Sequence, residues 1–466
     1  MEPVNQESIK KCNTIIIGAG LTGLSSGYHL KDNYVIFEAK PWTGGLAGSY
    51  HKEGFTFDHG GVHVLRTDDN YLKGKAKAHY NKLQRDLLEF NVVEKEKRAF
   101  VYFQGKYHVR PFQHNLHGAS QEVIKECLDG FYQRPNFSDD QKDDFMGTTK
   151  TFANFKEEIE AVFGSGLCKH FMYPYNKKAW CTKIENIRSK LWISKKFGTT
   201  FDENEFLDGI KYPNGIPKTL IRYPKKGGFG ATGAAIYNKI EQNVLTGARA
   251  TNIDTQNKII TIGSKDNNGN IQTQKYQYNN LVSTIPIPEL IKIIPSATQE
   301  VKQAASEYIF TSMLCVNIAI DKPVWTNKQY IYYPEESISF TRVSFPLNQS
   351  KEAAPEGKTG ICLEVPYSKE MPLGNEQEMV DRCMQDLIKT GILKGDEKIL
   401  FIDVKHVKYS YVVQNVTLNE NSKIVQQFLR PFNIYSIGRY GEWKHSGTEH
   451  AIDDGRKIAE KLNFNK

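Results

Sequence analysis

The apolar and polar positions near the start of the chain predict a strand, a tight turn and a helix. Residues 15–17 are three consecutive isoleucines, and a short β-branched run of this kind is typical of a buried strand. The run leads directly into Gly18, Gly20 and Gly23, and the pattern is then helical as far as Leu30. A fourth glycine, Gly27, lies within the predicted helix. We therefore expect the first elements of the fold to be organised around a glycine-rich turn.

The glycines of this turn, together with the acid that ends the next strand, predict a dinucleotide site. In such a site the first glycine permits the turn, the second lets the backbone approach a pyrophosphate, and the third lets the helix pack closely. The pyrophosphate would lie at the helix N-terminus, where unpaired N–H groups favour negative charge. The second strand, residues 34–37, ends at Glu38, which is placed to bind the ribose hydroxyls and would repel the ribose phosphate of NADP.

A second glycine-rich segment makes FAD the expected dinucleotide. Glycine-rich loops close many strand-helix turns, so the turn alone is weak evidence. Soon after Glu38 the chain reads Gly44-Gly45-Leu46-Ala47-Gly48, which we call the clasp. The clasp resembles the continuation found in flavoproteins that bind FAD and differs from NAD dehydrogenases.

The remaining pattern predicts further helices and two sets of strands. Residues 71–197 look mostly helical, with one hairpin at 99–109, and residues 208–221 look loop-like. A helix is expected to run from the glycines at 227–233 to about Gln242, and a buried strand at 278–285 would return to the first sheet.

The C-terminal half adds a second sheet and a closing glycine junction. Residues 376–390 predict a helix, and residues 399–411 predict an extended stretch. A final strand from Ile434 leads into Gly438-Arg439-Tyr440-Gly441 and a helix near Thr448, so we expect the first and last segments to meet around one ligand. The strands expected in the second sheet are residues 308–320, 329–333, 337–345 and 360–365.

Together these elements predict an α/β protein of three interleaved domains. A discontinuous Rossmann-like FAD-binding domain would comprise residues 1–75, 205–290 and 400–466. Residues 76–204 would form an inserted, mainly helical domain for the substrate or its nucleotide, and residues 291–399 an antiparallel β-sheet substrate domain. The length of 466 residues fits more than one domain.

Composition and charge narrow the functional class only slightly. Hydrophobic residues make up 39% and aromatic residues 12%, which argues against disorder. The net charge of +8, with both signs mixed along the chain, favours anionic ligands weakly and is poor evidence for nucleic acid. No apolar run is long enough to span a bilayer. The seven cysteines are scattered and form no CxxC pair, so we expect a reduced cytoplasmic location with no zinc site and no disulfide framework.

Four segments carry candidate chemistry that residue type alone leaves open. His63 follows Gly60-Gly61, where a histidine is more often part of a turn or core than catalytic. The segments 110–115 and 171–176 place aromatic side chains beside amides, which suits stacking on a planar base and reading its edge. Without further context, however, both segments are more typical of proline-bounded loops that pack on a core. The glycines at 227–233 could admit a cofactor or simply begin a helix.

The motifs together resemble the flavin-dependent UDP-galactopyranose mutases and, more broadly, the superfamily of amine oxidases and protoporphyrinogen oxidases. The superfamily signal is the glycine turn, the clasp, the strand that stops at Pro286 and the closing Gly-Arg-Tyr-Gly junction. The mutase-like signal consists of GVHVLRTD around His63, PFQHN, FMYPYNKKAW, and YIYYPEESISFTR, which ends at Arg342.

The resemblance implies a mutase that uses reduced FAD without net redox change. In such enzymes a nitrogen of the flavin attacks the anomeric carbon and expels the nucleoside diphosphate. The sugar opens as an iminium adduct, recloses as a furanose and regains the diphosphate. The implied substrate is a UDP-sugar, and the sequence is compatible with an external reductant such as NAD(P)H and with a homo-oligomer.

The resemblance also assigns roles to particular residues. It implies that His63 lies near the flavin and tunes it, and that the guanidinium of Arg342 binds the diphosphate beside the flavin. The cofactor residues it implies are Gly18, Gly20, Gly23, Glu38, Gly45, Leu46, Gly61 and Arg439. The substrate residues it implies are Phe112, Gln113, Tyr175, Asn176, Trp180, Lys196, Tyr332, Arg342, Tyr411 and His445.

Three positions depart from the family pattern. Lys196 stands where the family has a second phosphate arginine, and a lysine lacks the two-pronged fork of a guanidinium. His445 stands where the family has a phosphate tyrosine, and Arg110 replaces the tyrosine that stacks on the base. The sequence therefore leaves the sugar open.

Two other functions remain as alternatives at this stage. One is an FAD oxidase or desaturase acting on an amine or apolar substrate, for which Arg342, Tyr332 and Tyr411 are less expected. The other is a flavin-binding protein without turnover, suggested by Lys196 and His445. Taken singly, the two tyrosines could be core strand residues, and Arg342 could pair with a surface carboxylate.

Overall fold

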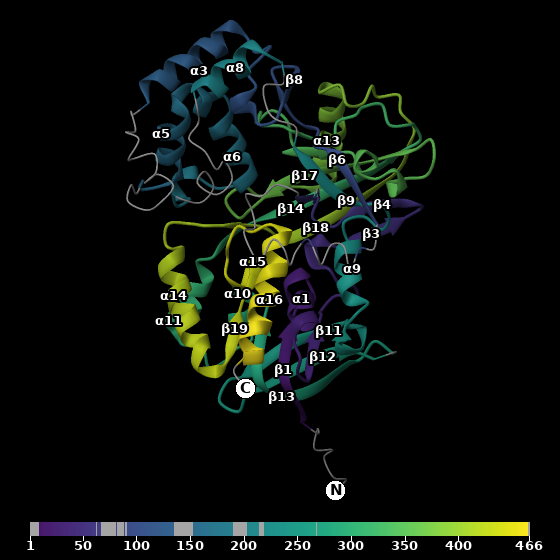
Figure 1. The fold of residues 1–466 in the computed structure, drawn as a ribbon, viewed down its shortest axis with the longest axis vertical. Coiled ribbons are helices and arrows are strands. Elements are labelled where there is room, and N and C mark those ends of the chain that lie inside the picture. The colour runs from purple at the N-terminus through teal and green to yellow at the C-terminus, as the bar shows by residue number, and fades with distance from the viewer. Residues whose placement is uncertain are drawn as a thin grey trace.

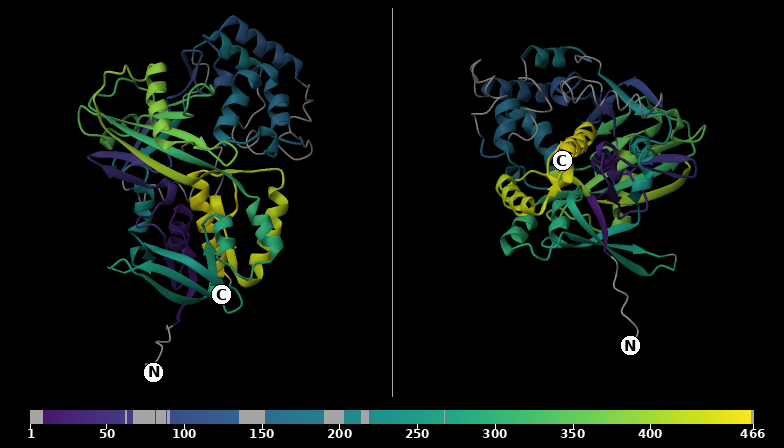
Figure 2. Two further views of the ribbon diagram at one scale, coloured as in Figure 1. Left: turned by 180° about the vertical axis from the view of Figure 1, so that it is seen from behind. Right: turned by 60° about the horizontal axis from the view of Figure 1, so that its bottom comes forward.

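The computed structural model describes residues 9–61, 63–66, 81, 88, 91–134, 152–189, 203–213, 219–266 and 268–464. These residues form two seven-stranded sheets, two smaller sheets and a group of helices (Figure 1). The sheet with the N-terminal strand lies at one end of the molecule, and the helices between β8 and β9 lie at the other end, beside the second large sheet (Figure 2). This architecture confirms the predicted α/β fold class.

The first large sheet combines segments from the beginning, middle and end of the chain. β1 (Lys10–Ile17) pairs in parallel with β2 (Tyr34–Phe37) and with β13 (Ile271–Ser283). β19 (Ile434–Ser436) pairs in parallel with β13. The strand predicted at 278–285 is therefore confirmed in this sheet, although it begins earlier because its first half forms a hairpin with β12. The other strands of this sheet are β10 (Val244–Leu245), β11 (Ala248–Asp254) and β12 (Ile259–Lys265).

The first and last long helices of the chain pack against each other beside this sheet (Figure 1). They are α1 (Leu21–His29) and α16 (Thr448–Phe464). A Cβ atom added to Gly455 would lie 2.4 Å from the carbonyl oxygen of Thr22, so glycine is required at this close approach. Ser25 Oγ also donates a hydrogen bond of 2.6 Å to the carbonyl of Ile452. The expectation that the two ends of the chain meet is confirmed by this contact.

The second large sheet is organised around β14 (Ile309–Ile320). This strand pairs in antiparallel fashion with β17 (Thr359–Tyr367) and β18 (Ile399–Val413). The predicted hairpin at 99–109 is confirmed and joins the sheet through a parallel pairing of β7 with β15. The prediction of a strand at 337–345 is wrong for the first half of this range, because residues 335–338 form a turn. The other strands are β15 (Tyr330–Tyr332), β16 (Arg342–Ser344), β7 (Ala99–Phe103) and β8 (Lys106–Val109).

The division into three domains stays a prediction, but three strands lie outside the expected grouping. β18 belongs to the second sheet, although the boundary at residue 400 assigns it to the FAD-binding domain. The β7–β8 hairpin also belongs to that sheet, although it falls within the range 76–204 that was expected to be mainly helical.

The helices at the far end pack through small residues. Within the range 71–197, which was predicted to be mostly helical, lie α3 (Gln121–Gln133) and α5 (Phe155–Leu167). They touch where Gly164 has a φ of 77°, and a Cβ atom there would lie 2.2 Å from the Gly130 carbonyl oxygen. The π-helix η3 (Cys168–Met172) and α6 (Tyr173–Trp180) follow directly.

The loop predicted at 208–221 is partly wrong. Helix α8 (Glu203–Lys211) continues into it, because Phe206 is buried in the hydrophobic core of this region and Gly209 allows close contact with the carbonyl of His114. The last two residues of the predicted loop belong to strand β9 (Leu220–Pro224). This strand pairs with β5 (Leu65–Arg66) and β6 (Val92–Glu96).

The helix expected to reach about Gln242 ends earlier. α9 (Ala231–Tyr237) stops at Asn238, and a 3-10 turn, η5 (Glu241–Asn243), leads into the next strand. None of the described helices is long and apolar enough to cross a membrane. The elements still to be named are η1 (Gly45–Ala47), β3 (Ser49–Lys52), β4 (Phe55–Asp58), η2 (Phe112–His114), η4 (Ile184–Asn186), α10 (Ile287–Lys292), α11 (Gln299–Ser306), α12 (Pro346–Gln349), η6 (Lys351–Ala353), α13 (Glu376–Lys389), α14 (Leu418–Leu429), η7 (Arg430–Phe432) and α15 (Gly438–Gly441).

Candidate active site

The glycine turn after β1 has the geometry that a bound pyrophosphate requires. Gly18 has a φ of 100°, and its N–H donates to the carbonyl of Phe37 at 2.8 Å, which ties the turn to β2. A Cβ atom on Gly23 would lie 1.9 Å from the carbonyl oxygen of Gly18, so this glycine sets the close packing of α1. A Cβ atom on Gly20 would meet no atom within 4 Å. Gly20 thus faces open space at the start of α1, as a site for a phosphate group would need.

Glu38 is held at the edge of this turn. Its Oε2 accepts a hydrogen bond of 2.8 Å from the N–H of Ala19, and its Oε1 accepts one of 2.9 Å from the N–H of Lys40. An ionised carboxylate offers about four acceptor positions, so two remain for other donors. The position is compatible with the predicted contact to ribose hydroxyls.

The clasp packs directly on the glycine turn. Gly44 donates its N–H to the carbonyl of Ala19 at 2.8 Å, and a Cβ atom on Gly45 would lie 3.3 Å from Gly20 Cα. A Cβ atom on Gly233 would lie 3.2 Å from Gly44 Cα, so the start of α9 closes on the same place. These close backbone approaches fit a dinucleotide cradle, which Gly18, Gly20, Gly23, Glu38 and Gly45 would help to form.

Leu46 links the clasp to the second sheet. It packs against a small cluster on the inner face of that sheet, and Tyr411 packs against the same cluster. The cluster contains Met313, Cys315, Cys362 and Val407. The cofactor-type cradle and the residues predicted for the substrate therefore lie next to each other.

His63 lies close to this region but does not line the same cavity as the predicted substrate residues. Burial, together with the positive charges of Arg342 and Arg439, lowers its pKa to about 3, so its imidazole is neutral at physiological pH. Its ring contacts Phe229 with the centroids 5.3 Å apart. It lines a separate cavity whose wall also includes Asp58, Gly61, Tyr223, Ser344, Pro346, Gln349 and Cys362.

Arg342 forms a two-pronged ion pair with Glu364, a residue that sequence reasoning missed. Nε donates to Oε1 and Nη2 to Oε2, both at 2.7 Å, and Nη1 lies 3.5 Å from the Tyr332 hydroxyl. Glu364 is only 1% exposed. The sequence did contain a signal, because Glu364 is the single charge within the apolar strand β17, and a buried carboxylate needs a cationic partner.

Several of the predicted substrate residues gather around this ion pair. The Trp180 ring lies 5.8 Å from that of Tyr411 and 6.0 Å from that of His445. Arg439 lies over the Tyr411 ring at 5.8 Å and donates to the carbonyl of Ser446 at 2.8 Å. We call the space that they enclose the basic cavity, and its wall consists of Arg110, Tyr175, Asn176, Ala179, Trp180, Tyr332, Thr341, Arg342, Glu364, Tyr411 and His445.

Two of the three phenols of the basic cavity, those of Tyr332 and Tyr411, differ in acidity. Burial raises the pKa of Tyr411 to about 12, so this hydroxyl stays protonated and can donate a hydrogen bond. Burial acts in the same direction on Tyr332, but the positive charges of Arg110 and Arg342 outweigh it and lower the pKa of this phenol. Both arrangements favour an anionic acceptor in the cavity.

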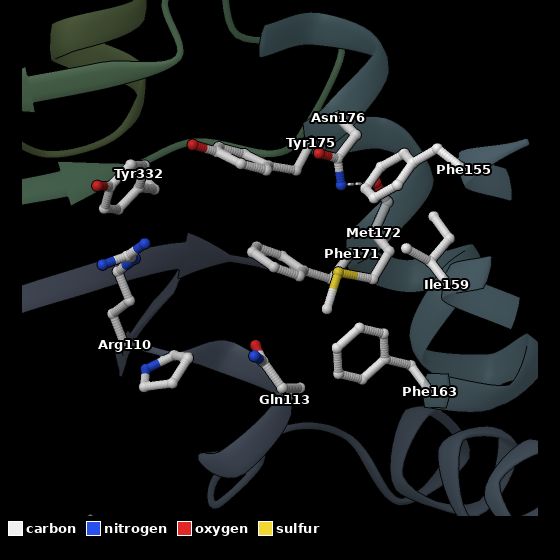
Figure 3. A pocket seen from close by; sticks show the side chains of 11 residues that line it. Arg110, Gln113, Phe155, Ile159, Phe163, Phe171, Met172, Tyr175, Asn176 and Tyr332 are labelled. Carbon is white, nitrogen blue, oxygen red and sulfur yellow. Dashed lines mark hydrogen bonds between the residues drawn. The ribbon is translucent and has the colours of Figure 1, made fainter. Parts of the chain in front are cut away.

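A second space adjoins the first and is mainly aromatic (Figure 3). Gln113 reaches it from the segment after β8, is 1% exposed, and its Nε2 has no hydrogen-bond partner among the described residues. Phe171 and Tyr175 stack along it, with centroids 5.4 Å apart and planes at 7°. We call it the aromatic cavity, and its wall consists of Arg110, Pro111, Gln113, Phe155, Ile159, Phe163, Phe171, Met172, Tyr175, Asn176 and Tyr332.

Three predicted substrate residues are placed differently from expectation or lie outside the structure. Phe112 is fully buried between Phe103 and Phe171 and lines neither cavity. The Asn176 amide is engaged within its own helix, since Nδ2 donates to the Met172 carbonyl at 2.8 Å and Oδ1 accepts from Trp180 Nε1 at 3.1 Å. Lys196 lies outside the described residues.

The apolar wall of the aromatic cavity was also missed. Phe155, Ile159 and Phe163 come from one face of α5, where they read as ordinary core positions. The 3- to 4-residue spacing fits a buried helix face equally well, so it is no separate signal for a cavity.

Comparison with known proteins places this geometry in a flavoprotein context. Residues 21–463 match the family model described as flavin containing amine oxidoreductase. The structure of a reduced UDP-galactopyranose mutase is 24% identical, with 98% of this chain and 94% of that chain covered and a TM-score of 0.81.

Two further solved structures share the fold and are described as oxidases. A protein from Exiguobacterium sp. 255-15, described as a candidate protoporphyrinogen oxidase, is 15% identical over 99% of this chain and 100% of its own, with a TM-score of 0.69. A double mutant of putrescine oxidase is 11% identical, with 98% of this chain and 100% of that chain covered and a TM-score of 0.64. At these identities the likeness shows the fold, which hosts several chemistries.

Proposed function

Since this chain belongs to the flavin containing amine oxidoreductases, we propose that it binds FAD in the glycine turn and clasp and interconverts the pyranose and furanose forms of a UDP-sugar. The mutase among the similar structures supports this choice. The substrate, the direction of the reaction and the requirement for reduced FAD are all part of the proposal.

The observation that carries the proposal is the pair of adjoining cavities. The aromatic cavity offers stacked rings and the amide of Gln113, which suits a planar base with hydrogen-bonding edges. The basic cavity offers guanidinium and phenol donors, which suit phosphate oxygens. A nucleoside diphosphate joined to a sugar has these two parts in the same order. A hydrocarbon would use none of these donors, and the positive charges of Arg110 and Arg342 would repel a protonated amine.

The residues of the basic cavity would bind and orient the leaving group. The reduced flavin, when bound, supplies a nucleophilic nitrogen for the anomeric carbon. Tyr411 stays protonated and donates to a phosphate oxygen, and Arg342 offers Nη1, because Nε and Nη2 are occupied by Glu364. Each hydrogen bond to a charged group contributes about 1.5–3 kcal/mol, so these donors would stabilise the departing diphosphate.

Glu364 would act as a positioning residue in this scheme. Its carboxylate fixes the plane of the Arg342 guanidinium and thereby directs Nη1 towards Tyr332. His63 stays neutral, so its ring would offer one hydrogen-bond donor and one acceptor to the flavin without adding a charge.

The test is an assay of oxidised and reduced protein against a panel of UDP-sugars under anaerobic conditions. The proposal predicts a ring-isomer product with the reduced protein and none with the oxidised protein. Gln113→Leu and Tyr411→Phe should both lower the rate. Absence of any ring isomer across the panel with a fully reduced, flavin-loaded sample would contradict the proposal.

A second function, oxidation or desaturation of an amine or apolar substrate, is favoured by one observation. The end of the aromatic cavity far from Arg110 is walled by Phe155, Ile159, Phe163 and Met172, and could hold an apolar chain (Figure 3). This function predicts fast loss of the oxidised flavin spectrum on mixing with such a substrate, and formation of peroxide on reoxidation. An oxidised flavin that is unchanged by amines and apolar substrates would exclude it.

A further inference from the structure

Arg110 stands where the two cavities join. It follows β8 directly, and its backbone N–H donates to the carbonyl of Ala99 at 3.0 Å, which anchors it to the second sheet. Its side chain lines both cavities, and among the residues that the structure describes only Tyr175, Asn176 and Tyr332 also do so. Figure 3 shows the guanidinium beside the Tyr332 ring, on the same side of the cavity as that ring. Anything that occupies both cavities must pass this set of four residues.

The charge of Arg110 is less compensated than that of the neighbouring arginine. Its guanidinium lies 4.6 Å from the centroid of the Tyr332 ring, and no carboxylate among the described residues forms an ion pair with it. By contrast, Arg342 forms an ion pair with Glu364, in which Nη2 lies 2.6 Å from Oε1. A cation held in a largely buried wall with only an aromatic face beside it retains donors for an anion.

The length and chemistry of a UDP-sugar place its diphosphate at this junction. With the base in the aromatic cavity and the diphosphate with its sugar in the basic cavity, the end of the diphosphate nearest the nucleoside lies at the junction. We infer that Arg110 binds the diphosphate at the junction of the two cavities and so selects nucleoside diphosphates over nucleosides. This inference rests on the proposed function and adds a phosphate-binding residue at a position where the resembling family has a base-stacking tyrosine.

The alternative for Arg110 is to stack on the base through its guanidinium plane. The two roles make opposite predictions, because stacking does not depend on the number of phosphates, whereas a phosphate contact does. A comparison of the affinities for uridine, UMP and UDP therefore distinguishes phosphate binding from base stacking.

The experiment measures the dissociation constants of uridine, UMP and UDP for the flavin-loaded protein and for Arg110→Gln, Arg110→Lys and Arg110→Tyr. Arg98→Gln serves as the matched control, because Arg98 is an exposed arginine just before β7, outside both cavities. Flavin content and thermal unfolding verify that each variant is folded, and Arg110→Lys keeps the test valid if the neutral variants are unstable.

We expect Arg110→Gln and Arg110→Tyr to weaken UDP binding by about 10- to 100-fold while uridine changes by less than about twofold. The UDP affinity of Arg110→Lys should lie between those of these variants and of the original protein. Arg98→Gln should leave all three dissociation constants unchanged. Equal weakening of uridine and UDP, or no weakening of UDP, would overturn the inference while leaving the proposed function standing. If the original protein itself fails to bind UDP, both the inference and the proposed function are wrong.

Discussion

Arg342 and Glu364 meet in a buried two-pronged ion pair, with Nε–Oε1 and Nη2–Oε2 distances of 2.7 Å, on adjacent strands of the second sheet. The pair makes Arg342 a fixed, partly neutralised cation. It also explains why Gly61 must be a glycine, since a Cβ atom there would lie 2.1 Å from Glu364 Oε1. The segment that carries His63 is thereby held against the ion pair.

We predict that Arg342 and Glu364 are strongly coupled in stability. Removing one partner leaves a buried charge without compensation, which costs about 3–5 kcal/mol of the free energy of unfolding. Urea unfolding of Arg342→Gln, Glu364→Gln and the double variant should give a coupling energy of about 1–3 kcal/mol. Additive losses would show that the two side chains act independently.

We predict that Gln113→Leu separates stability from binding. The Nε2 group of Gln113 is buried without a partner among the described residues, and such a group costs about 1–3 kcal/mol. The variant should therefore unfold at the same or a higher urea concentration, while its affinity for UDP falls by about tenfold or more. Isothermal titration calorimetry measures the affinity, and an unchanged value would mean that the aromatic cavity does not hold the base.

The glycine turn should tolerate a methyl group at one position and not at another. Gly20→Ala adds a Cβ atom in open space, so the protein without flavin should keep its stability but bind FAD more weakly. Gly23→Ala adds a Cβ atom that would lie 1.9 Å from the Gly18 carbonyl oxygen. This variant should therefore be less stable even without flavin. Thermal unfolding and flavin titration of both variants check this, and equal stability losses would contradict it.

Sequence reasoning succeeded where a local pattern has one structural meaning. The glycine turn, Glu38 and the clasp come together as predicted because each sits at the end of a strand or the start of a helix. The buried pair of Arg342 with Glu364 and the apolar wall from α5 required tertiary contacts between distant segments. Phe112 was predicted to contact the substrate but is buried in the core. An aromatic residue beside an amide has the same sequence pattern in a core and in a ligand cavity.

We predict that His63 makes stability depend on pH in a defined direction. Its folded-state pKa of about 3 lies below the ordinary value of 6.5, so the unfolded chain binds a proton more readily. The stabilising contribution is complete above pH 6.5 and is lost as the pH falls towards 3. The free energy of unfolding should decline less steeply between pH 6.5 and 4 in His63→Gln. Parallel curves would show that His63 is solvated and titrates normally.

The central claim is that a reduced flavin promotes isomerisation of a UDP-sugar without being consumed. The most direct measurement is the number of furanose products formed per flavin after one stoichiometric anaerobic reduction, with the flavin spectrum recorded throughout. The account predicts many products per flavin while the spectrum stays that of the reduced state. A yield of one product or fewer per flavin, or reoxidation in step with product formation, would contradict it.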